Sequence, residues 1–134
     1  MDKHQRRIFL HRLTHGFLGG KASGVPLLLL TTTGRKSRIP RTVPLGYFMH
    51  DDSYVIVGSN VGKPTHPEWM LNLMQNPYAR IQIGGTKMEV VSTLATDEQR
   101  DKLWEMAVRT SDLFDGYRKN TSRRIEFAIL RPPR

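Results

Sequence analysis

LLLLTTTGRKSRIPRTVPLGY, residues 27–47, is the stretch that decides the fold. It begins with an apolar run, passes through three threonines into a glycine turn, and returns to an apolar pattern that contains two prolines. An apolar run bounded by turn residues predicts a short strand that is buried on both faces. The stretch therefore predicts a buried strand, a tight turn and the start of a second strand.

The turn gathers positive charge. Arg35 and Lys36 lie in it, and Arg41 follows on the way into the second strand. A tight turn leaves backbone N–H groups unpaired, and a guanidinium group offers a planar fork that suits phosphate or carboxylate. We therefore expect an anionic ligand at this turn.

Six strands and two helices are expected after residue 24. Apolar or alternating patterns bounded by turn residues predict strands over 27–33, 42–50, 53–59, 79–83, 86–94 and 125–131. Thr65 with Glu68 and Thr96 with Gln99 have the spacing of helix capping boxes, and the second helix is expected over 97–110. Short antiparallel strands joined by hairpin turns indicate a mainly β (α+β) protein that closes into a small barrel, because closure removes unpaired edges.

The composition is that of one soluble globular domain. The chain has 134 residues, of which 38% are hydrophobic and 25% charged, and a domain of this size buries a core without disulfides or metal ions. Cysteine is absent. This excludes disulfide bridges, thiolate metal sites, dithiol redox chemistry and covalent haem attachment.

The net charge is strongly positive, because 21 lysines and arginines outnumber 12 aspartates and glutamates by nine. Such an excess favours a nucleic acid, an acidic membrane surface or a phosphorylated small molecule as partner. The cations are spread along the chain rather than gathered in one block. We therefore expect no nucleic-acid partner.

The segment of residues 1–24 is predicted to be separate from a barrel domain of residues 25–134. Residues 3–18 have the apolar spacing of a basic amphipathic helix, and glycines follow it. Such a helix packs on the barrel or on a second copy of the chain, or it touches anionic lipid. No secretory pattern and no apolar run of membrane-spanning length is visible, so we expect a cytoplasmic protein, with the inner face of the plasma membrane as the alternative location.

No familiar catalytic or metal motif is present. The turn lacks the glycine and lysine positions of a phosphate loop, and no GxGxxG or GxSxG sequence occurs. His11 and His15 have the spacing of two metal ligands on a helix, but no carboxylate lies near them in the sequence, so we expect no metal site. If the protein is an enzyme, a cofactor supplies the chemistry.

Four motifs together resemble the deazaflavin-dependent nitroreductase family. They are LLLLTTTGRKS, PRTVPL, YVIVGSNVGKPTHPEWMLNLMQNP and ATDEQRDKLW, and the resemblance covers about residues 25–131. Members of this family are small split β-barrels, similar to FMN-binding proteins, that bind the 8-hydroxy-5-deazaflavin coenzyme F-420. The resemblance implies an oxidoreductase that uses the reduced coenzyme to transfer hydride to a quinone, a nitroaromatic compound or an activated alkene.

The resemblance also implies site residues. Arg35, Lys36 and Arg41 would hold the anionic tail of the coenzyme, in agreement with the anion site inferred from the residues themselves. The other implied cofactor contacts are Pro44, Gly58, Ser59, Asn60, Pro67, Trp69 and Asn72. Two positions depart from the family pattern: Arg38 stands where relatives commonly have glycine, and Asn60 stands where they often have a cation.

Ser59 and Tyr117 are the candidates for a direct catalytic role that the resemblance implies. Ser59 and the backbone N–H groups near it would bond a ring carbonyl or the substrate. Tyr117 would orient the substrate, because it lies in the segment that closes the substrate side in the family. Simpler alternatives are a core position for Trp69, an internal polar contact for Asn72 and a packing role for Tyr117.

Two other functions fit the same residues. An FMN-binding split barrel would place one phosphate at the Arg35 turn, and a non-catalytic relative would bind a lipid or another ligand there. The expected partners are a small-molecule acceptor, a second copy of the chain in a homodimer, and an anionic membrane touched by residues 3–18.

Overall fold

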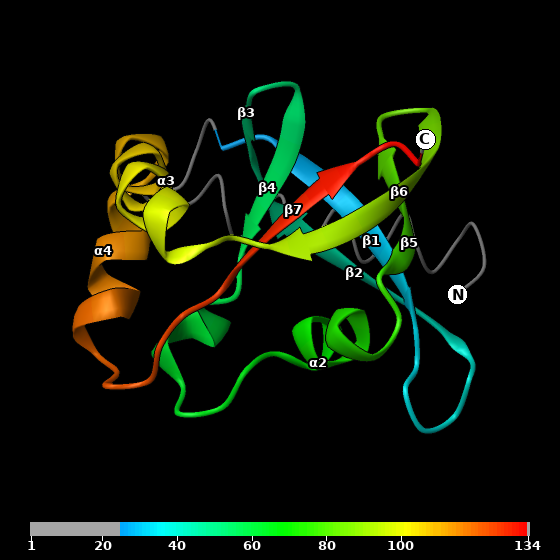
Figure 1. The fold of residues 1–134 in the computed structure, drawn as a ribbon, viewed down its shortest axis with the longest axis horizontal. Coiled ribbons are helices and arrows are strands. Elements are labelled where there is room, and N and C mark those ends of the chain that lie inside the picture. The colour runs from blue at the N-terminus through cyan, green and yellow to red at the C-terminus, as the bar shows by residue number, and fades with distance from the viewer. Residues whose placement is uncertain (1–24, 134) are drawn as a thin grey trace.

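Residues 25–133 are described by a computed structural model of the chain, and they form one curled antiparallel sheet flanked by helices (Figure 1). The helix predicted over residues 3–18 lies outside the described residues. The strands are, in spatial order, β2 (Pro40–Gly46), β1 (Leu27–Thr33), β5 (Tyr78–Ile83), β6 (Thr86–Leu94), β7 (Phe127–Arg131), β4 (Ser53–Val57) and β3 (Phe48–His50). The helical elements are η1 (Asn60–Gly62), α2 (Glu68–Gln75), α3 (Asp97–Thr110) and α4 (Asp112–Lys119).

The sheet is closed by its own chain. β2 and β3 form its two opposite edges, yet a single residue, Tyr47, joins them. Seven strands laid flat would separate these edges by about 29 Å, whereas the two Cα steps across Tyr47 reach at most about 7.6 Å. The sheet therefore curls until its edges approach each other. Since β2 pairs with β1 and β3 pairs with β4, the result is a split barrel, as predicted.

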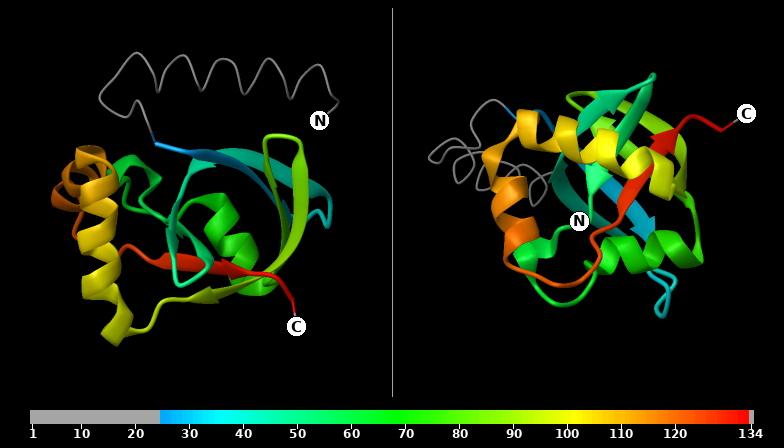
Figure 2. Two further views of the ribbon diagram at one scale, coloured as in Figure 1. Left: turned by 90° about the horizontal axis from the view of Figure 1, so that it is seen from above. Right: turned by 60° about the vertical axis from the view of Figure 1, so that its left-hand side comes forward.

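The inside of the barrel is filled by one apolar cluster, and α2 covers one end of it (Figures 1 and 2). Trp69, Met70 and Leu73 of α2 pack against the inward side chains of the sheet. Those inward residues are Leu28, Leu30, Ile56, Ala79, Ile81, Val90, Ala128 and Leu130. Burial of this cluster fixes α2 against β1, next to the turn that leads to β2.

β4 and β7 are buried on both faces. Their inward residues belong to the barrel core, while the outward residues Val55, Phe127 and Ile129 lie in a second cluster. α3 contributes Leu103 and Ala107 to that cluster, and Figure 2 shows α3 and α4 together on this side of the sheet. The second cluster fixes the end of β4, from which the chain continues to η1 and α2.

Most of the predicted strands are confirmed. The strands expected over 27–33 and 86–94 have these boundaries in the structure. The hairpin turn between β3 and β4 is also confirmed: Asp51 and Asp52 both have positive φ, 49° and 61°, as a two-residue hairpin turn of this hand requires.

The prediction of one strand over 42–50 is wrong. The chain leaves the first edge of the sheet after Gly46 and enters the other edge at Phe48, so the segment forms two strands and the total is seven. The N–H of Tyr47 donates to the carbonyl of Pro26 (3.1 Å), which holds the crossing point beside the start of β1.

One predicted capping box is confirmed and the other is wrong. The hydroxyl of Thr96 accepts the N–H of Gln99 (3.3 Å), and the side chain of Gln99 accepts the N–H of Thr96 (2.9 Å). The helix predicted to begin at Thr65 begins instead after Pro67, which has no side-chain cap. The carbonyl of Thr65 accepts Nδ2 of Asn60 (3.0 Å) and thereby closes the preceding loop.

The sequence does not predict α4. Ser111 ends α3, and its hydroxyl accepts the N–H of Leu113 (3.2 Å), which starts α4 directly. Phe114 and Tyr117 therefore lie on a helix, with their rings edge to face at a centroid distance of 6.4 Å. None of the helices in residues 25–133 is long and apolar enough to cross a membrane.

The turn between β1 and β2 is held by its own backbone. The N–H of Gly34 donates to the carbonyl of Ile39, and the N–H of Arg38 donates to the carbonyl of Gly34, both at 2.9 Å. A Cβ on Gly34 would lie 2.5 Å from the hydroxyl of Ser37 and 3.0 Å from the carbonyl of Ile39, so a larger residue there would force the turn to shift. Arg38 has a φ of 63°, in the left-handed region that favours glycine.

Replacing Arg38 with glycine should therefore stabilise the protein. Glycine adopts the left-handed backbone without the strain of about 1–2 kcal/mol that a non-glycine residue has there. The greater freedom of glycine in the unfolded chain offsets about 0.5–1 kcal/mol of this gain in stability. We expect Arg38→Gly to raise the free energy of unfolding by about 0.5–1 kcal/mol, measured by urea denaturation. Arg38→Ala removes the same charge but keeps the Cβ, so an equal gain from it would contradict this explanation.

Candidate functional site

Asn72 of α2 fixes the β1–β2 turn. Asn72 is only 4% exposed, and its Oδ1 accepts the backbone N–H (3.2 Å) and Nη1 (3.0 Å) of Arg35. Its Nδ2 donates to the buried hydroxyl of Thr32 (3.0 Å). One buried amide thus holds the end of β1, the turn and the Arg35 side chain together, because breaking any of these bonds would leave a buried polar group unpaired.

Glu68 neutralises part of the charge of Arg35. Its Oε2 lies 2.6 Å from Nη1 of Arg35, and this hydrogen bond together with the positive charge of Arg35 holds the pKa of Glu68 below its usual value. The carboxylate is therefore ionised at neutral pH. Because the Glu68 side chain is 79% exposed, water screens the pair, and an anionic ligand can compete for the guanidinium group.

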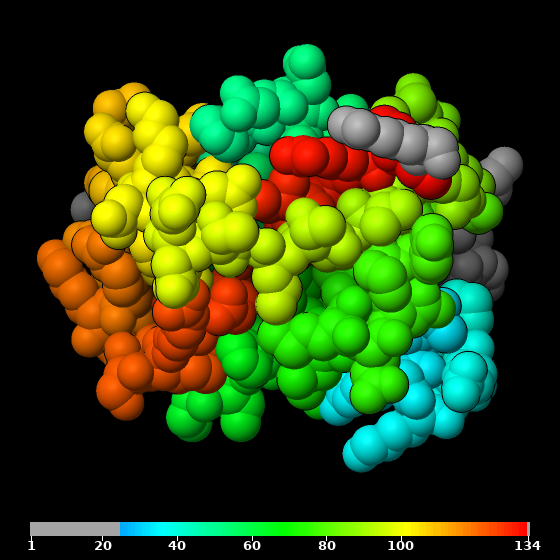
Figure 3. Space-filling view, in the orientation of Figure 1, coloured from blue at the N-terminus to red at the C-terminus, as the bar shows by residue number. Residues whose placement is uncertain are grey.

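A cleft of about 600 Å³ opens between the turn, the start of α2 and β2, and we call it the Arg35 cleft. Figure 3 shows the turn standing out at the edge of the molecular surface. The lining brings together five of the predicted cofactor contacts: Arg35, Lys36, Arg41, Trp69 and Asn72. Glu68 is the one carboxylate in this lining, against three cations. The cleft is therefore positive and suits an anion.

A second group of predicted residues lies on the loop between β4 and α2. Ser59 has a right-handed helical backbone conformation (φ −72°, ψ −31°), and Asn60 has a left-handed one (φ 48°). This pair of conformations points successive backbone N–H groups into one concave nest. Within residues 25–133, the N–H groups of Ser59, Asn60 and Val61 have no acceptor, and neither has the hydroxyl of Ser59, which is 7% exposed. These four donors form the Ser59 nest.

Two predicted cofactor contacts on this loop, Gly58 and Asn60, have roles within the protein itself. A Cβ on Gly58 would lie 2.8 Å from Cε of Met70 and 3.0 Å from the carbonyl of Glu126, so a larger residue would displace Met70 and crowd the backbone at Glu126. Nδ2 of Asn60 donates to the carbonyl of Thr65 (3.0 Å), so this side chain braces the loop.

Three further predicted residues, Pro44, Pro67 and Tyr117, are not in the lining of the Arg35 cleft. Pro44 pairs with Leu29 in the sheet, and Pro67 directly precedes α2. Tyr117 lies on α4 next to η1, since its backbone carbonyl is 3.2 Å from the position that a Cβ on Gly62 would take. Tyr117 is therefore a neighbour of the loop that carries the Ser59 nest.

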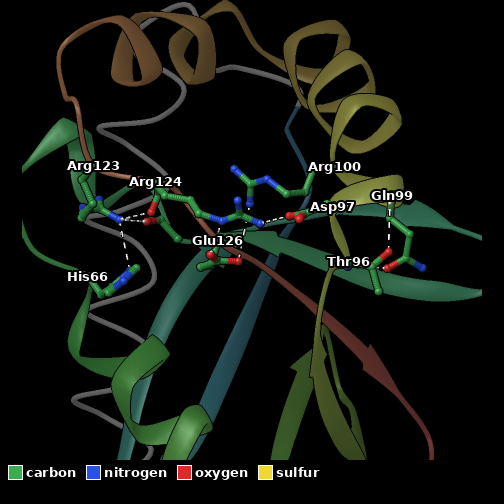
Figure 4. Close-up of polar contacts among 9 residues, drawn as sticks. His66, Thr96, Asp97, Gln99, Arg100, Arg123, Arg124 and Glu126 are labelled. Atoms are coloured by element: carbon green, nitrogen blue, oxygen red, sulfur yellow. Dashed lines mark hydrogen bonds and ion pairs between the residues drawn. The ribbon is translucent and has the colours of Figure 1, made fainter.

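Arg123 also belongs to the site, and sequence reasoning misses it. Its guanidinium group donates to the carbonyls of Gly58 (3.2 Å), Ser59 (2.9 Å) and Lys63 (3.1 Å). A further contact of 3.2 Å joins it to Nδ1 of His66 (Figure 4). In the sequence it is one of several cations near the end of the chain, and only the tertiary contacts distinguish it from the others.

Comparison with known proteins gives one consistent result. Residues 4–132 match the family model described as F420H(2)-dependent quinone reductase. A protein of that description from Mycobacterium tuberculosis is 34% identical over 125 residues, which cover 90% of this chain and 84% of the relative. The solved structure of an F420-H2 dependent reductase (FDR-A) aligns with a TM-score of 0.72 at 33% identity, over 79% of this chain and 94% of that chain. A domain-swapped dimer aligns with the same TM-score of 0.72 at 30% identity, over 94% of this chain and 99% of that chain.

The pairing of Glu68 with Arg35 predicts the effect of removing this carboxylate. Glu68→Gln frees Arg35 for a ligand anion, and we expect it to bind inorganic phosphate about two- to five-fold more tightly than the wild type, the range typical of an exposed ion pair. The measurement is a titration followed by backbone amide chemical shifts at the turn. Glu89→Gln removes a carboxylate that pairs with Arg80 elsewhere (2.7 Å) and should change nothing. Weaker binding by Glu68→Gln would show that Glu68 does not compete with the anion for Arg35.

Proposed function

The chain belongs to the F420H(2)-dependent quinone reductase family, and we propose that it binds reduced coenzyme F-420 through the Arg35 cleft and the Ser59 nest and transfers hydride to a quinone. One observation carries the proposal: three cations line a single cleft beside a helix, and the loop before that helix has four hydrogen-bond donors that no group within residues 25–133 accepts. The first part suits an anionic tail, and the second suits the carbonyl groups of a ring.

The residues of the Arg35 cleft fit the tail of the coenzyme. Its phosphate and carboxylates need charged donors, and Arg35 and Arg41 offer planar forks while Lys36 offers an exposed point charge. Each hydrogen bond to a charged group contributes about 1.5–3 kcal/mol. Three such residues, opposed by one carboxylate, would hold a polyanion.

The Ser59 nest and Trp69 fit a planar ring with carbonyl oxygens. Ser59 is buried, and buried donors without an acceptor are costly, so a bound carbonyl would satisfy the donors of Ser59. Trp69 is 7% exposed and packs into the barrel core, so it presents a rigid apolar wall to the cleft. An apolar wall excludes water and strengthens the hydrogen bonds beside it.

In the proposed reaction, the protein positions the acceptor and stabilises the charge that develops on it. When bound, the reduced deazaflavin would supply a hydride to an electron-poor carbon of the quinone, and water would supply the proton that completes the reduction. The protein must hold that carbon within about 3–3.5 Å of the hydride and meet the negative charge that develops on the quinone oxygen. Ser59 and the backbone N–H groups of the nest would do the latter, and Tyr117 would orient the acceptor from α4.

We further propose that the quinone is taken from the inner face of a membrane by a cytoplasmic homodimer. The net charge of +9 supports contact with anionic lipid, with residues 3–18 as the contact segment, and the domain-swapped relative supports the dimer. We expect the protein to float with anionic vesicles at low salt and not with neutral ones. Equal recovery with both kinds of vesicle would contradict the membrane contact.

Titration with F-420, followed by fluorescence quenching, tests the cofactor assignment. We expect the wild type to bind, and Arg35→Ala and Arg41→Ala each to weaken binding by about 10- to 100-fold through loss of charged hydrogen bonds. Arg80→Ala is the matched control, because Arg80 pairs with Glu89 outside the Arg35 cleft and should leave the affinity unchanged.

FMN and lipid vesicles are titrated in parallel, since bound FMN and bound deazaflavin differ in their visible spectra. Binding of FMN in place of F-420 would contradict the proposal in favour of an FMN-dependent split barrel. Binding of lipid alone would contradict it in favour of a non-catalytic relative.

A further inference from the structure

We propose that Arg123 is a positioning residue that sets the direction of the hydrogen-bond donors in the Ser59 nest. Arg123 contacts the loop rather than the Arg35 cleft, so its effect on the reaction passes through the backbone. What the donors bind rests on the proposed function, but their orientation can be tested without any ligand.

The guanidinium group of Arg123 donates hydrogen bonds to backbone carbonyl oxygens. Nη2 donates to the carbonyl of Ser59 (2.9 Å), Nη1 to that of Gly58 (3.2 Å) and Nε to that of Lys63 (3.1 Å). Five donors in a rigid fork let one arginine bond several carbonyls at once. The position of the loop backbone is therefore coupled to one side chain.

The direction of these carbonyls fixes the direction of the N–H groups. In a trans peptide the C=O and N–H bonds point to opposite sides, and the described chain has no cis peptide bond. When Arg123 holds the carbonyls of Gly58 and Ser59, the N–H groups of Ser59 and Asn60 must point away from it. These are two of the donors that no group in residues 25–133 accepts.

The loop needs such a clamp because its backbone is strained. Residues 60–62 have consecutive positive φ angles of 48°, 50° and 79°. This conformation costs about 1 kcal/mol or more for each non-glycine residue, and a β-branched residue such as Val61 adopts it least readily. Arg123 bonds a carbonyl on each side of the strained turn, that of Ser59 before it and that of Lys63 after it, and so opposes its relaxation.

The charge of Arg123 also strengthens the donors. No carboxylate in the described part of the chain pairs with it, and burial lowers its pKa below the usual value, but a guanidinium group remains protonated at neutral pH. A cation that bonds a carbonyl polarises the peptide, and linked hydrogen bonds strengthen one another by about 10–30% each. The N–H groups beyond those carbonyls are therefore better donors to an oxygen that gains negative charge.

The Arg35 cleft has its own anchors, so a change at Arg123 should spare it. Nη1 of Arg123 reaches His66, just before α2. The apolar face of α2 fixes the helix against the barrel core. From this helix, Asn72 bonds Arg35 of the turn and Thr32 of β1. Loss of Arg123 is therefore expected to disturb the nest while the cations of the cleft keep their geometry.

Arg123→Met and Arg123→Lys test the proposal, and Arg124→Met is the matched control. Methionine removes the charge and the donors, while lysine keeps the charge but cannot bond three carbonyls as a fork does. Arg124, the next residue, bonds the carboxylates of Asp97 and Glu126 instead (Figure 4). Thermal denaturation shows which variants fold, and if Arg123→Met does not, Arg123→Lys carries the test.

The first readout needs no ligand. In ¹H–¹⁵N spectra of the free protein, we expect the amide signals of Ser59, Asn60 and Val61 to shift or broaden in both Arg123 variants. In Arg124→Met they should keep their wild-type positions. Unchanged signals in the Arg123 variants would overturn the proposal, whichever cofactor the protein binds.

The second readout separates rate from affinity. We expect kcat for quinone reduction with reduced F-420 to fall about 10- to 100-fold in Arg123→Met, no more than the loss of one oxyanion donor. The affinity for F-420 should fall less, by under about tenfold, because the cations of the Arg35 cleft still hold its tail. Added guanidinium ion should restore part of the rate in Arg123→Ala. An unchanged kcat, or an equal loss in Arg124→Met, would overturn the proposal. Failure of the wild type to bind F-420 would overturn the proposed function alone, because the amide signals still decide the role of Arg123.

Discussion

Tyr47 joins the two opposite edges of a seven-stranded sheet, and this one-residue connection is the constraint on which the rest of the structure depends. A sheet so tethered cannot lie flat, so it curls and its inward apolar residues need a cover at the open end. α2 provides it with Trp69, Met70 and Leu73. Closure therefore brings α2 against a turn 37 residues earlier in the chain, measured from Asn72 to Arg35.

The candidate site depends on polar anchors as much as on net charge. Asn72 uses both ends of one buried amide to hold β1 and the cationic turn, and Arg123 uses one guanidinium group to hold the loop after β4. Each anchor fixes a backbone segment and leaves other groups, such as the N–H groups of the nest, without a partner in residues 25–133. Rigid positioning of donors before a ligand arrives is what electrostatic catalysis requires, since no reorganisation is then needed during the reaction.

Local patterns predict most of the fold and half of the site. Arg35, Lys36 and Arg41 are close in sequence, so a turn suffices to gather them, and the capping box at Thr96 is a local contact. The break at Tyr47 is not predictable in this way, because the residues on both sides of it have strand patterns and only the sheet order separates them. The role of Arg123 depends on bonds to residues 60 to 65 positions away, which no local pattern encodes.

We propose that the Arg35 cleft and the Ser59 nest form one binding site for one coenzyme. Mapping of backbone amide chemical shifts during addition of F-420 tests this most directly. We expect the amides of the turn at Lys36 and of the nest at Ser59, Asn60 and Val61 to shift together and to saturate at the same concentration. Shifts confined to one of the two groups, or saturation of the two at different concentrations, would contradict it.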